Sequence, residues 1–205
     1  MSAAAVGVPA GNAFDKDASR NPVARRLVSR FRADLDELWE RAAPESVLDV
    51  GCGDGALAWR WASRLGDRPV VAVDRDDARL RASWAARRRA NLAFRAGDAC
   101  RLEFGADEFD LAAAVEVLEH VADPDAALAE LRRVARRWLL VSVPREPLWR
   151  ALNVARGAYL RRLGDTPGHL HHWSRRAFTA LVSRYGAVSV ARSPIPWTML
   201  LVRVG

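Results

Sequence analysis

The sequence predicts an α/β protein in which a largely parallel sheet is covered by helices. Short apolar runs alternate with helical periodicities between residues 46 and 143, which is typical of βαβ units. A glycine-rich turn at residues 51–55 follows the first apolar run, at the start of a helical stretch. The chain has 205 residues, 50% of them hydrophobic, which favours one domain with a full core.

The elements up to residue 143 follow one another regularly. The first is an amphipathic helix that opens at Asn21-Pro22 and ends before Pro44, with apolar residues at helical spacing. The strand-like runs after it are residues 46–50, 70–73, 92–94, 109–114 and 138–143. The helices between these runs are expected at residues 56–65, 77–90 and 124–136. Strands this apolar are buried on both faces of a parallel sheet.

The regular alternation stops after Pro144. An apolar stripe on a helix over residues 148–163, followed by a turn at residues 164–168, predicts an inserted cap at about residues 144–173. A helix over residues 174–185 comes next, with Ser174 as its N-cap. Two strand-like runs follow at residues 188–191 and 197–204. No helix separates them, so they must pair antiparallel or lie apart, because a parallel crossover needs a dozen or more residues.

Composition narrows the class of protein. The net charge is +7, but Lys16 is the only lysine and the arginines are spread along the helical stretches, so the charge is weak support for a nucleic-acid partner. Cys52 and Cys100 are the only cysteines, which argues against a disulfide framework and fits a reducing compartment. Residues 1–20 are expected to be a flexible tail without the features of a signal peptide, so a cytoplasmic location is expected.

The loop after the first strand can hold a nucleotide-like ligand. Residues 47–55 run from an apolar strand into a glycine-rich turn, where the backbone can approach a ligand and a helix N-terminus offers unpaired N–H groups. Asp74 follows the next strand about 20 residues further on, where a carboxylate can accept hydrogen bonds from ribose hydroxyls. This pattern implies a cofactor that carries a nucleoside.

The loop alone does not distinguish two cofactor classes. Gly51, Gly53 and Ala56 also satisfy the dinucleotide fingerprint, so an NAD(P)-dependent oxidoreductase is an alternative. Asp49 favours another ligand, because a carboxylate at the strand end suits a cationic amino group, such as that of methionine, better than a pyrophosphate. The alternative role for Asp49 is to order the loop through backbone N–H groups.

The motifs together resemble those of class I S-adenosylmethionine-dependent methyltransferases. V-L-D-V-G-C-G-D-G followed by A-V-D-R resembles motif I and the acidic position after it. Residues 96–99 resemble the stretch whose Asp approaches adenine, and residues 109–121 resemble strand four of the type 11 group, the ubiquinone/menaquinone-biosynthesis type. The similarity covers about residues 45–143. It implies S-adenosyl-L-methionine as cofactor and a Rossmann-like doubly wound sheet of seven strands, in the order 3-2-1-4-5-7-6 with the last strand antiparallel.

The resemblance also implies roles for single residues. Gly51, Gly53 and Gly55 would border the methionine moiety, Asp74 the ribose, Asp98 and Ala99 the adenine, and Glu116 with Val117 the far wall. The other residues expected at the cofactor are Asp49, Cys52 and Arg75. Three alternatives stay open: Asp98 as an ordinary turn residue, Glu116 as a solvated strand end, and Cys52 as a small residue in a tight loop.

Histidines are the candidate bases on the acceptor side, because a hydroxyl or phenol acceptor must lose a proton and His is matched to neutral pH. His120 lies just beyond the strand-four motif, with packing at a helix start as its alternative role. Residues 168–174 resemble the G-H-x-x-H-[FW]-[ST] stretch of related methyltransferases, so His169 and His172 are the preferred candidates, against capping and packing roles. His171 completes the histidines. No metal is expected, because the usual zinc-ligand spacing is absent.

The acceptor is expected to be a small molecule, methylated at oxygen, nitrogen or an activated carbon. The [DN]-P-P-[FYW] tetrapeptide of base and glutamine methyltransferases is absent, and so is a Pro-Cys nucleophile, which disfavours nucleic acid. The arginines of the cap could recognise an anionic acceptor, or its amphipathic stripe could bind a membrane surface that supplies a quinone-like or lipid substrate. The alternatives are a solvated or packed helix and, for the chain as a whole, an inactive cofactor-binding partner subunit. The sequence does not indicate an oligomeric state.

Overall fold

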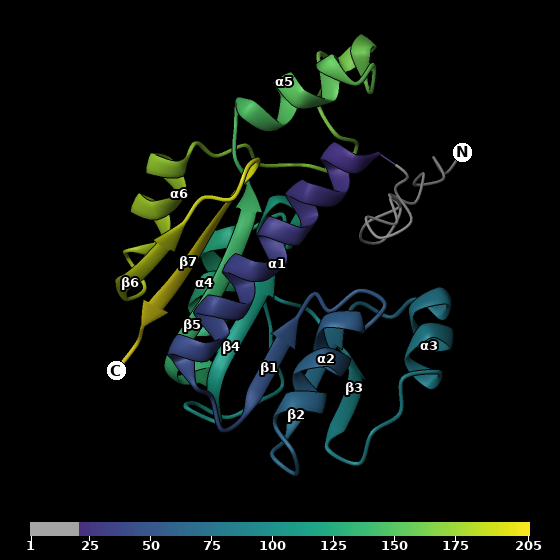
Figure 1. Ribbon diagram of the computed structural model, residues 1–205. Helices are drawn as coiled ribbons and strands as arrows, with labels where there is room; N and C mark the ends of the chain where they lie inside the picture. The colour runs from purple at the N-terminus through teal and green to yellow at the C-terminus, as the bar shows by residue number, and fades with distance from the viewer. Residues whose placement is uncertain (1–20) are drawn as a thin grey trace, which may run out of the picture.

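The sheet has seven strands in the order β3-β2-β1-β4-β5-β7-β6 in the computed structural model, which describes residues 21–205 (Figure 1). The strands are β1 (Val47–Val50), β2 (Val70–Asp74), β3 (Leu92–Ala96), β4 (Phe109–Val115), β5 (Ala135–Pro144), β6 (Ala187–Arg192) and β7 (Trp197–Arg203). β7 is antiparallel to both of its neighbours, and the pairs from β3 to β5 are all parallel. The predicted fold class, strand order and antiparallel last strand are confirmed. The tail predicted at residues 1–20 lies outside the described residues.

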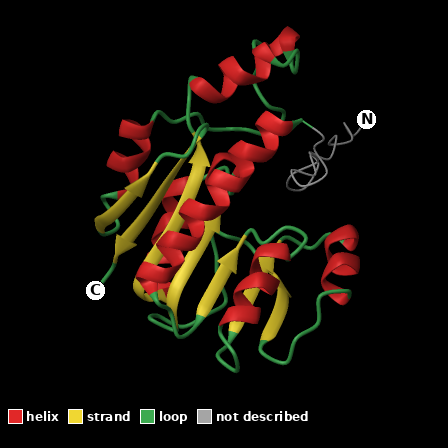
Figure 2. Cartoon of the chain, viewed as in Figure 1, coloured by secondary structure: helices red, strands yellow, loops and turns green. Residues whose placement is uncertain are grey.

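Helices cover both faces of the sheet, which gives the layers seen in Figure 2. One face carries α1 (Pro22–Ala42), α2 (Ala56–Arg64) and α3 (Ala78–Ala85), and the other carries α4 (Pro124–Val134) and α6 (Arg175–Val182). Side chains cap the N-termini of several of these helices. Asn21 Oδ1 accepts a hydrogen bond from the Val23 N–H at 2.9 Å, and Ser174 Oγ accepts one from the Ala177 N–H at 3.2 Å. The predicted N-cap role of Ser174 is therefore confirmed.

Two apolar clusters, one on each face of the sheet, form the core. On the first face, Trp39 of α1 stacks on Trp61 of α2 with ring centroids 4.9 Å apart. On the second face, Leu128 and Leu131 of α4 and Phe178 of α6 are fully buried. The central strands β1, β4 and β7 are therefore buried from both sides, as their apolar runs predicted, whereas the edge strands β3 and β6 are partly exposed.

Besides the cap helix, three predicted helices end at least two residues earlier than expected, and one of them, α6, ends at Val182 rather than residue 185. α3 ends at Ala85 rather than residue 90, because the next N–H groups bond to carbonyls only three residues back. α4 ends at Val134, and residues 135–137 extend β5 instead. The physical reason is Asp110, a fully buried carboxylate that draws the guanidinium groups of Arg136 and Arg137 to 3.2 and 3.0 Å.

The predicted helix over residues 148–163 is wrong in its extent. α5 (Leu148–Ala155) ends before Gly157, whose φ of +74° belongs to the left-handed region, and η2 (Leu160–Arg162) is a separate 3-10 turn. Leu163, at the end of the expected apolar stripe, is 76% exposed. α5 lies beyond the carboxyl edge of the sheet (Figure 1). No helix within residues 21–205 is both long and apolar enough to cross a membrane.

Candidate functional site

A cavity of about 500 Å³ opens at the carboxyl ends of the central parallel strands. Its volume lies in the range of small-molecule sites. The lining residues come from the ends of β1 and β2 and from the loops that follow β1, β2, β3 and β4: Val50, Gly51, Val73, Asp74, Arg75, Gly97, Asp98, Ala99, Cys100, Glu116, Val117, His120, Val121 and Ala122. This is the edge at which open α/β sheets bind their ligands.

The glycine loop begins at a position that admits no side chain. Gly51 has a φ of +74°, and a Cβ there would lie 2.4 Å from Val117 Cγ2. Its N–H donates to the Val73 carbonyl at 2.7 Å, which holds the loop against the end of β2. The loop therefore depends on glycine at this position.

Asp74 both orders the loop and faces the cavity. Its Oδ2 accepts a hydrogen bond from the Gly53 N–H at 2.7 Å, and its Oδ1 accepts one from the Arg75 N–H at 2.8 Å. Each carboxylate oxygen carries two lone pairs, so further hydrogen bonds from ligand hydroxyls remain available. The arrangement suits a ligand with a pair of hydroxyl groups.

Asp49 is buried in β1, beneath the loop rather than in the wall of the cavity. Its side chain is 2% exposed, and its Oδ2 has no hydrogen-bond partner among the described residues. Burial, and then the negative charge of Asp74, raises the pKa of Asp49 to about 8. A buried carboxyl group without a donor fits a cationic group brought by a ligand, since an unpaired buried polar atom is costly.

Asp98 is a turn residue that also lines the cavity. Its Oδ1 accepts a hydrogen bond from the Cys100 N–H at 2.9 Å, in a turn that follows β3. Ala99 and Cys100 line the cavity beside it. Both interpretations of Asp98 from the sequence therefore fit the geometry.

Glu116 lies at the end of β4 with a φ of +61°, which is unusual for a residue with a side chain. Its Oε1 accepts a hydrogen bond from Ser142 Oγ at 2.9 Å, and its Oε2 accepts one from Trp197 Nε1 at 2.6 Å. The alternative of a solvated strand end is wrong. Ser142 and Trp197 were not predicted as partners of Glu116, because Ser142 reaches it through the β4–β5 pairing and Trp197 through the β5–β7 pairing, which no local pattern predicts.

The structure places the other predicted cofactor residues in two groups. Arg75 and Val117 line the cavity, whereas Cys52, Gly53 and Gly55 do not. Cys52 is buried and packs in the α1–α2 cluster. Gly55 begins α2, and a Cβ there would lie 2.4 Å from Phe94 Cε1. Cys52 and Gly55 thus have packing roles in the described fold.

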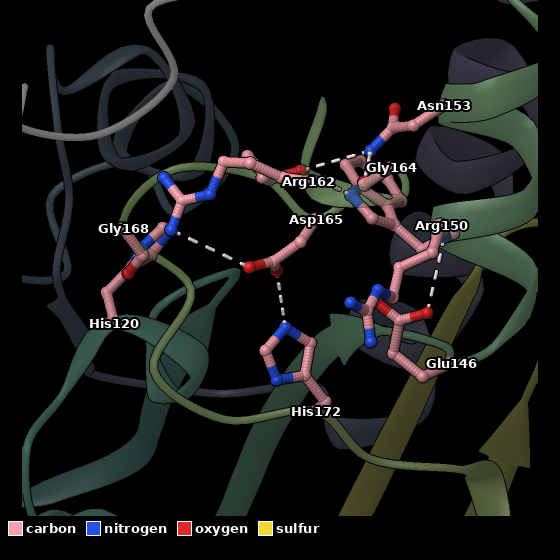
Figure 3. Close-up of polar contacts among 11 residues, drawn as sticks. His120, Glu146, Arg150, Asn153, Arg162, Gly164, Asp165, Gly168 and His172 are labelled. Carbon is pink, nitrogen blue, oxygen red and sulfur yellow. Dashed lines mark hydrogen bonds and ion pairs between the residues drawn. The ribbon is translucent and has the colours of Figure 1, made fainter. Parts of the chain in front are cut away.

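His120 lies in the turn after β4, and the other three histidines lie in the segment predicted as the cap. His120 lines the cavity. The centroid of the His169 ring lies 5.0 Å from the centroid of the His120 ring. His172 lies a further 6.4 Å from His169, and its Nε2 is 2.7 Å from Asp165 Oδ1 (Figure 3). His171 Nε2 lies 3.0 Å from the Val121 carbonyl oxygen, which gives this histidine a structural role.

Glu146 is a cap residue that the sequence did not single out. Burial raises the pKa of its carboxyl group, and its Oε2 accepts a hydrogen bond from the Arg150 N–H at 3.2 Å (Figure 3). Its Oε1 is buried without a hydrogen-bond partner in the described part of the chain. The cap is further held by Asn153, whose amide donates to the Gly164 carbonyl at 2.8 Å.

Curated proteins with similar sequences are named as methyltransferases. Residues 48–138 match the family described as methyltransferase domain. A demethylmenaquinone methyltransferase of Beutenbergia cavernae is 32% identical over 158 residues, covering 72% of this chain and 63% of the relative. A ubiquinone biosynthesis O-methyltransferase of Caulobacter sp. (strain K31) is 32% identical over 162 residues, covering 73% and 64%. The chain thus spans less than two thirds of either relative.

Solved structures support the fold. The crystal structure of magnesium protoporphyrin IX methyltransferase from Synechocystis PCC 6803 with bound S-adenosylhomocysteine superposes with a TM-score of 0.66 at 17% identity. The superposition covers 96% of this chain and 96% of that one. At this identity the similarity establishes the fold alone.

Proposed function

We propose that the chain transfers a methyl group from S-adenosylmethionine to a small-molecule acceptor, because residues 48–138 match a methyltransferase domain and relatives that are 32% identical are named as methyltransferases. The cavity at the carboxyl edge would hold the cofactor, and residues 144–173 would form a cap on the acceptor side.

The observation that carries the proposal is the buried carboxyl group of Asp49. Its unpartnered Oδ2 and raised pKa fit the cationic amino group of a methionine moiety above the loop. A pyrophosphate would bring negative charge next to Asp74 and would supply no donor for the buried Asp49 Oδ2, so the alternative of a dinucleotide cofactor is disfavoured.

The remaining cavity residues would bind the rest of the cofactor. Asp74 would accept hydrogen bonds from the ribose hydroxyls, and Asp98 with Ala99 would border the adenine. Glu116 and Val117 would close the far wall, where hydrogen bonds from Ser142 and Trp197 keep the Glu116 carboxylate in place. The bound cofactor supplies an electrophilic methyl group, and the chain contributes its orientation, a factor that can account for roughly 7 to 11 kcal/mol of the barrier.

A small-molecule acceptor is supported by relatives named for demethylmenaquinone methylation and for ubiquinone biosynthesis. His120, His169 and His172 are the candidate acceptor-side residues. Asp165 would orient the imidazole of His172 as a general base, in the way that a carboxylate orients the histidine of a catalytic triad. His120 lies nearest to the cofactor cavity and His169 lies between the two.

The test combines binding with turnover in the full chain. Thermal-shift measurements with S-adenosylmethionine should show stabilisation, and incubation with pooled small metabolites should yield S-adenosylhomocysteine together with a methylated acceptor. Stabilisation without turnover on any pool would support the alternative of an inactive cofactor-binding subunit. The absence of both would remove the proposal.

A further inference from the structure

A cluster of two histidines and a glutamate lies beside the cofactor cavity. Glu119, His120 and His169 each offer one ligand atom, and these atoms all lie within 4.8 Å of one another. We propose that the three side chains form a binding site for one divalent transition-metal ion of the Zn²⁺ type. Spacing along the chain did not predict the site, because His169 is far from Glu119 and His120 in sequence.

Backbone hydrogen bonds hold the two halves of the cluster together. The Glu119 carbonyl oxygen, in the 3-10 turn η1 (Leu118–His120), accepts from the Leu170 N–H at 2.7 Å and from the His171 N–H at 3.3 Å. These bonds flank His169 on its C-terminal side. The separation between the ligand atoms is therefore a property of the folded chain, and binding requires little rearrangement of the backbone.

The hydrogen bond made by His120 Nδ1 leaves Nε2 as the ring nitrogen that can bind a metal. His120 Nδ1 lies 2.9 Å from the Gly168 carbonyl oxygen, which can only accept a hydrogen bond, so Nδ1 carries the proton (Figure 3). The lone pair is then on Nε2. Metal-bound histidines commonly donate their other N–H to a carbonyl in this way, which fixes the tautomer and the orientation of the ring.

The distances fit a metal after small side-chain movements. His120 Nε2 lies 3.9 Å from Glu119 Oε1, and the Glu119 side chain is 2% exposed. Ligand atoms around a tetrahedral Zn²⁺ lie about 3.4 Å apart, given metal–ligand bonds of about 2.0 to 2.2 Å. A shift of about half an ångström closes this pair, and the third ligand needs a shift of about 1 to 1.5 Å.

The set of donors selects the class of metal. Two imidazoles and one carboxylate are the three protein ligands of many catalytic zinc sites, which keep a fourth position open, and also of non-haem iron sites. Mg²⁺ and Ca²⁺ prefer oxygen ligands throughout. His120 also lines the cofactor cavity, so the open position would face the place where an acceptor meets the cofactor.

This position would give the metal a role in substrate selection. Provided that the proposed function holds, an acceptor oxygen bound at the open position would be held near the methyl donor, and its pKa would be lowered by the cation. The acceptor class would then be a molecule with a hydroxyl group able to bind a metal. The metal site itself does not depend on this step.

The test uses tag-free full-length protein treated with a chelator and then titrated with Co²⁺. Visible absorption of Co²⁺ reports its coordination by protein ligands, and calorimetry with Zn²⁺ gives the stoichiometry. The proposal predicts one ion per chain and, for Glu119→Gln and His169→Ala, affinity lowered on the order of 100-fold or more, as expected when a ligand is lost. His172→Ala is the matched control, because His172 belongs to the same segment but lies outside the cluster.

Circular dichroism and thermal unfolding report whether each variant is folded. Absence of stoichiometric Co²⁺ binding to the wild-type chain would overturn the metal site, as would equal losses in His172→Ala and His169→Ala when both are folded. Metal binding needs neither cofactor nor acceptor. Its failure is therefore distinguishable from failure of the proposed methyl transfer.

Discussion

At the scale of single residues, the carboxyl group of Asp49 gives a prediction about how cofactor binding depends on pH. Its folded-state pKa of about 8 is above its ordinary value of 3.8, so without ligand it disfavours the folded state increasingly as pH rises through that interval. A bound ammonium group favours the ionised carboxylate. Binding should therefore release a proton near neutral pH, with affinity rising up to about tenfold per unit between about pH 6 and 7.5.

This pH effect is measurable with S-adenosylhomocysteine. Calorimetry in buffers of different ionisation enthalpy counts the released protons, and Asp49→Asn should abolish both the release and the rise in affinity with pH. If the Asn variant releases as many protons as the wild-type chain, Asp49 is not the group that meets the ligand.

Asp74 gives a second prediction at this scale. Asp74→Ala should weaken cofactor binding by about 1.5 to 3 kcal/mol, because hydrogen bonds to a charged acceptor are lost, while the fold persists. The matched control is Asp76→Ala, since Asp76 is outside the cavity lining and pairs with Arg81. An unchanged dissociation constant for Asp74→Ala would exclude the residue from the ribose site.

Local patterns predicted much of the site but not its longer-range contacts. The loop at Gly51 and the carboxylate of Asp74 were predictable because each follows a strand in a short, regular unit. The partners of Glu116 were not, since Ser142 meets it through the β4–β5 pairing and Trp197 through the β5–β7 pairing.

Strand positions followed from the sequence because each strand contains a short, largely apolar run. The start of β5 did not follow from it, since residues 135–137 continue the helical pattern of α4. The ion pairs of Arg136 and Arg137 with the buried Asp110 hold these residues in the extended conformation of β5 instead. These ion pairs join residues far apart in sequence. The cap helix was overextended because its apolar stripe continues past Gly157, where the backbone turns.

Asp110 yields a prediction about this end of the sheet. Asp110→Ala should lower the free energy of unfolding by about 1 to 3 kcal/mol, because it removes the acceptor of the Glu45 N–H and the partner of two half-exposed arginines. Urea denaturation measures the change. Since Asp110 lies at the amino end of β4, away from the cavity, affinity for S-adenosylhomocysteine should be retained, and a large loss of affinity would contradict its structural role.

The cap gives the prediction for the acceptor side. His172→Ala should lower kcat by about 10²- to 10⁴-fold if the imidazole is a base, with the loss eased at high pH for a phenolic acceptor, and without change in cofactor affinity. Leu170→Ala, an exposed position in the same segment, is the control. A smaller loss at every pH would assign His172 to positioning. A wild-type rate would move the search for a base to His120.

At the scale of the whole molecule, one sheet edge brings together groups from four strands. The helical layers on both faces leave the carboxyl edge as the open part of the central sheet, and α5 lies beyond it (Figure 1). The cofactor cavity, the Glu119–His120–His169 cluster and the cap histidines all lie along this edge. Cofactor and acceptor would therefore meet at this edge.

The central claim is that this edge binds S-adenosylmethionine rather than a dinucleotide, and calorimetry with S-adenosylhomocysteine and NADH tests it most directly. The account predicts one S-adenosylhomocysteine per chain with a dissociation constant of about 1 μM, which is about −8 kcal/mol, and no measurable binding of NADH. Tight binding of NADH with no response to S-adenosylhomocysteine would contradict it.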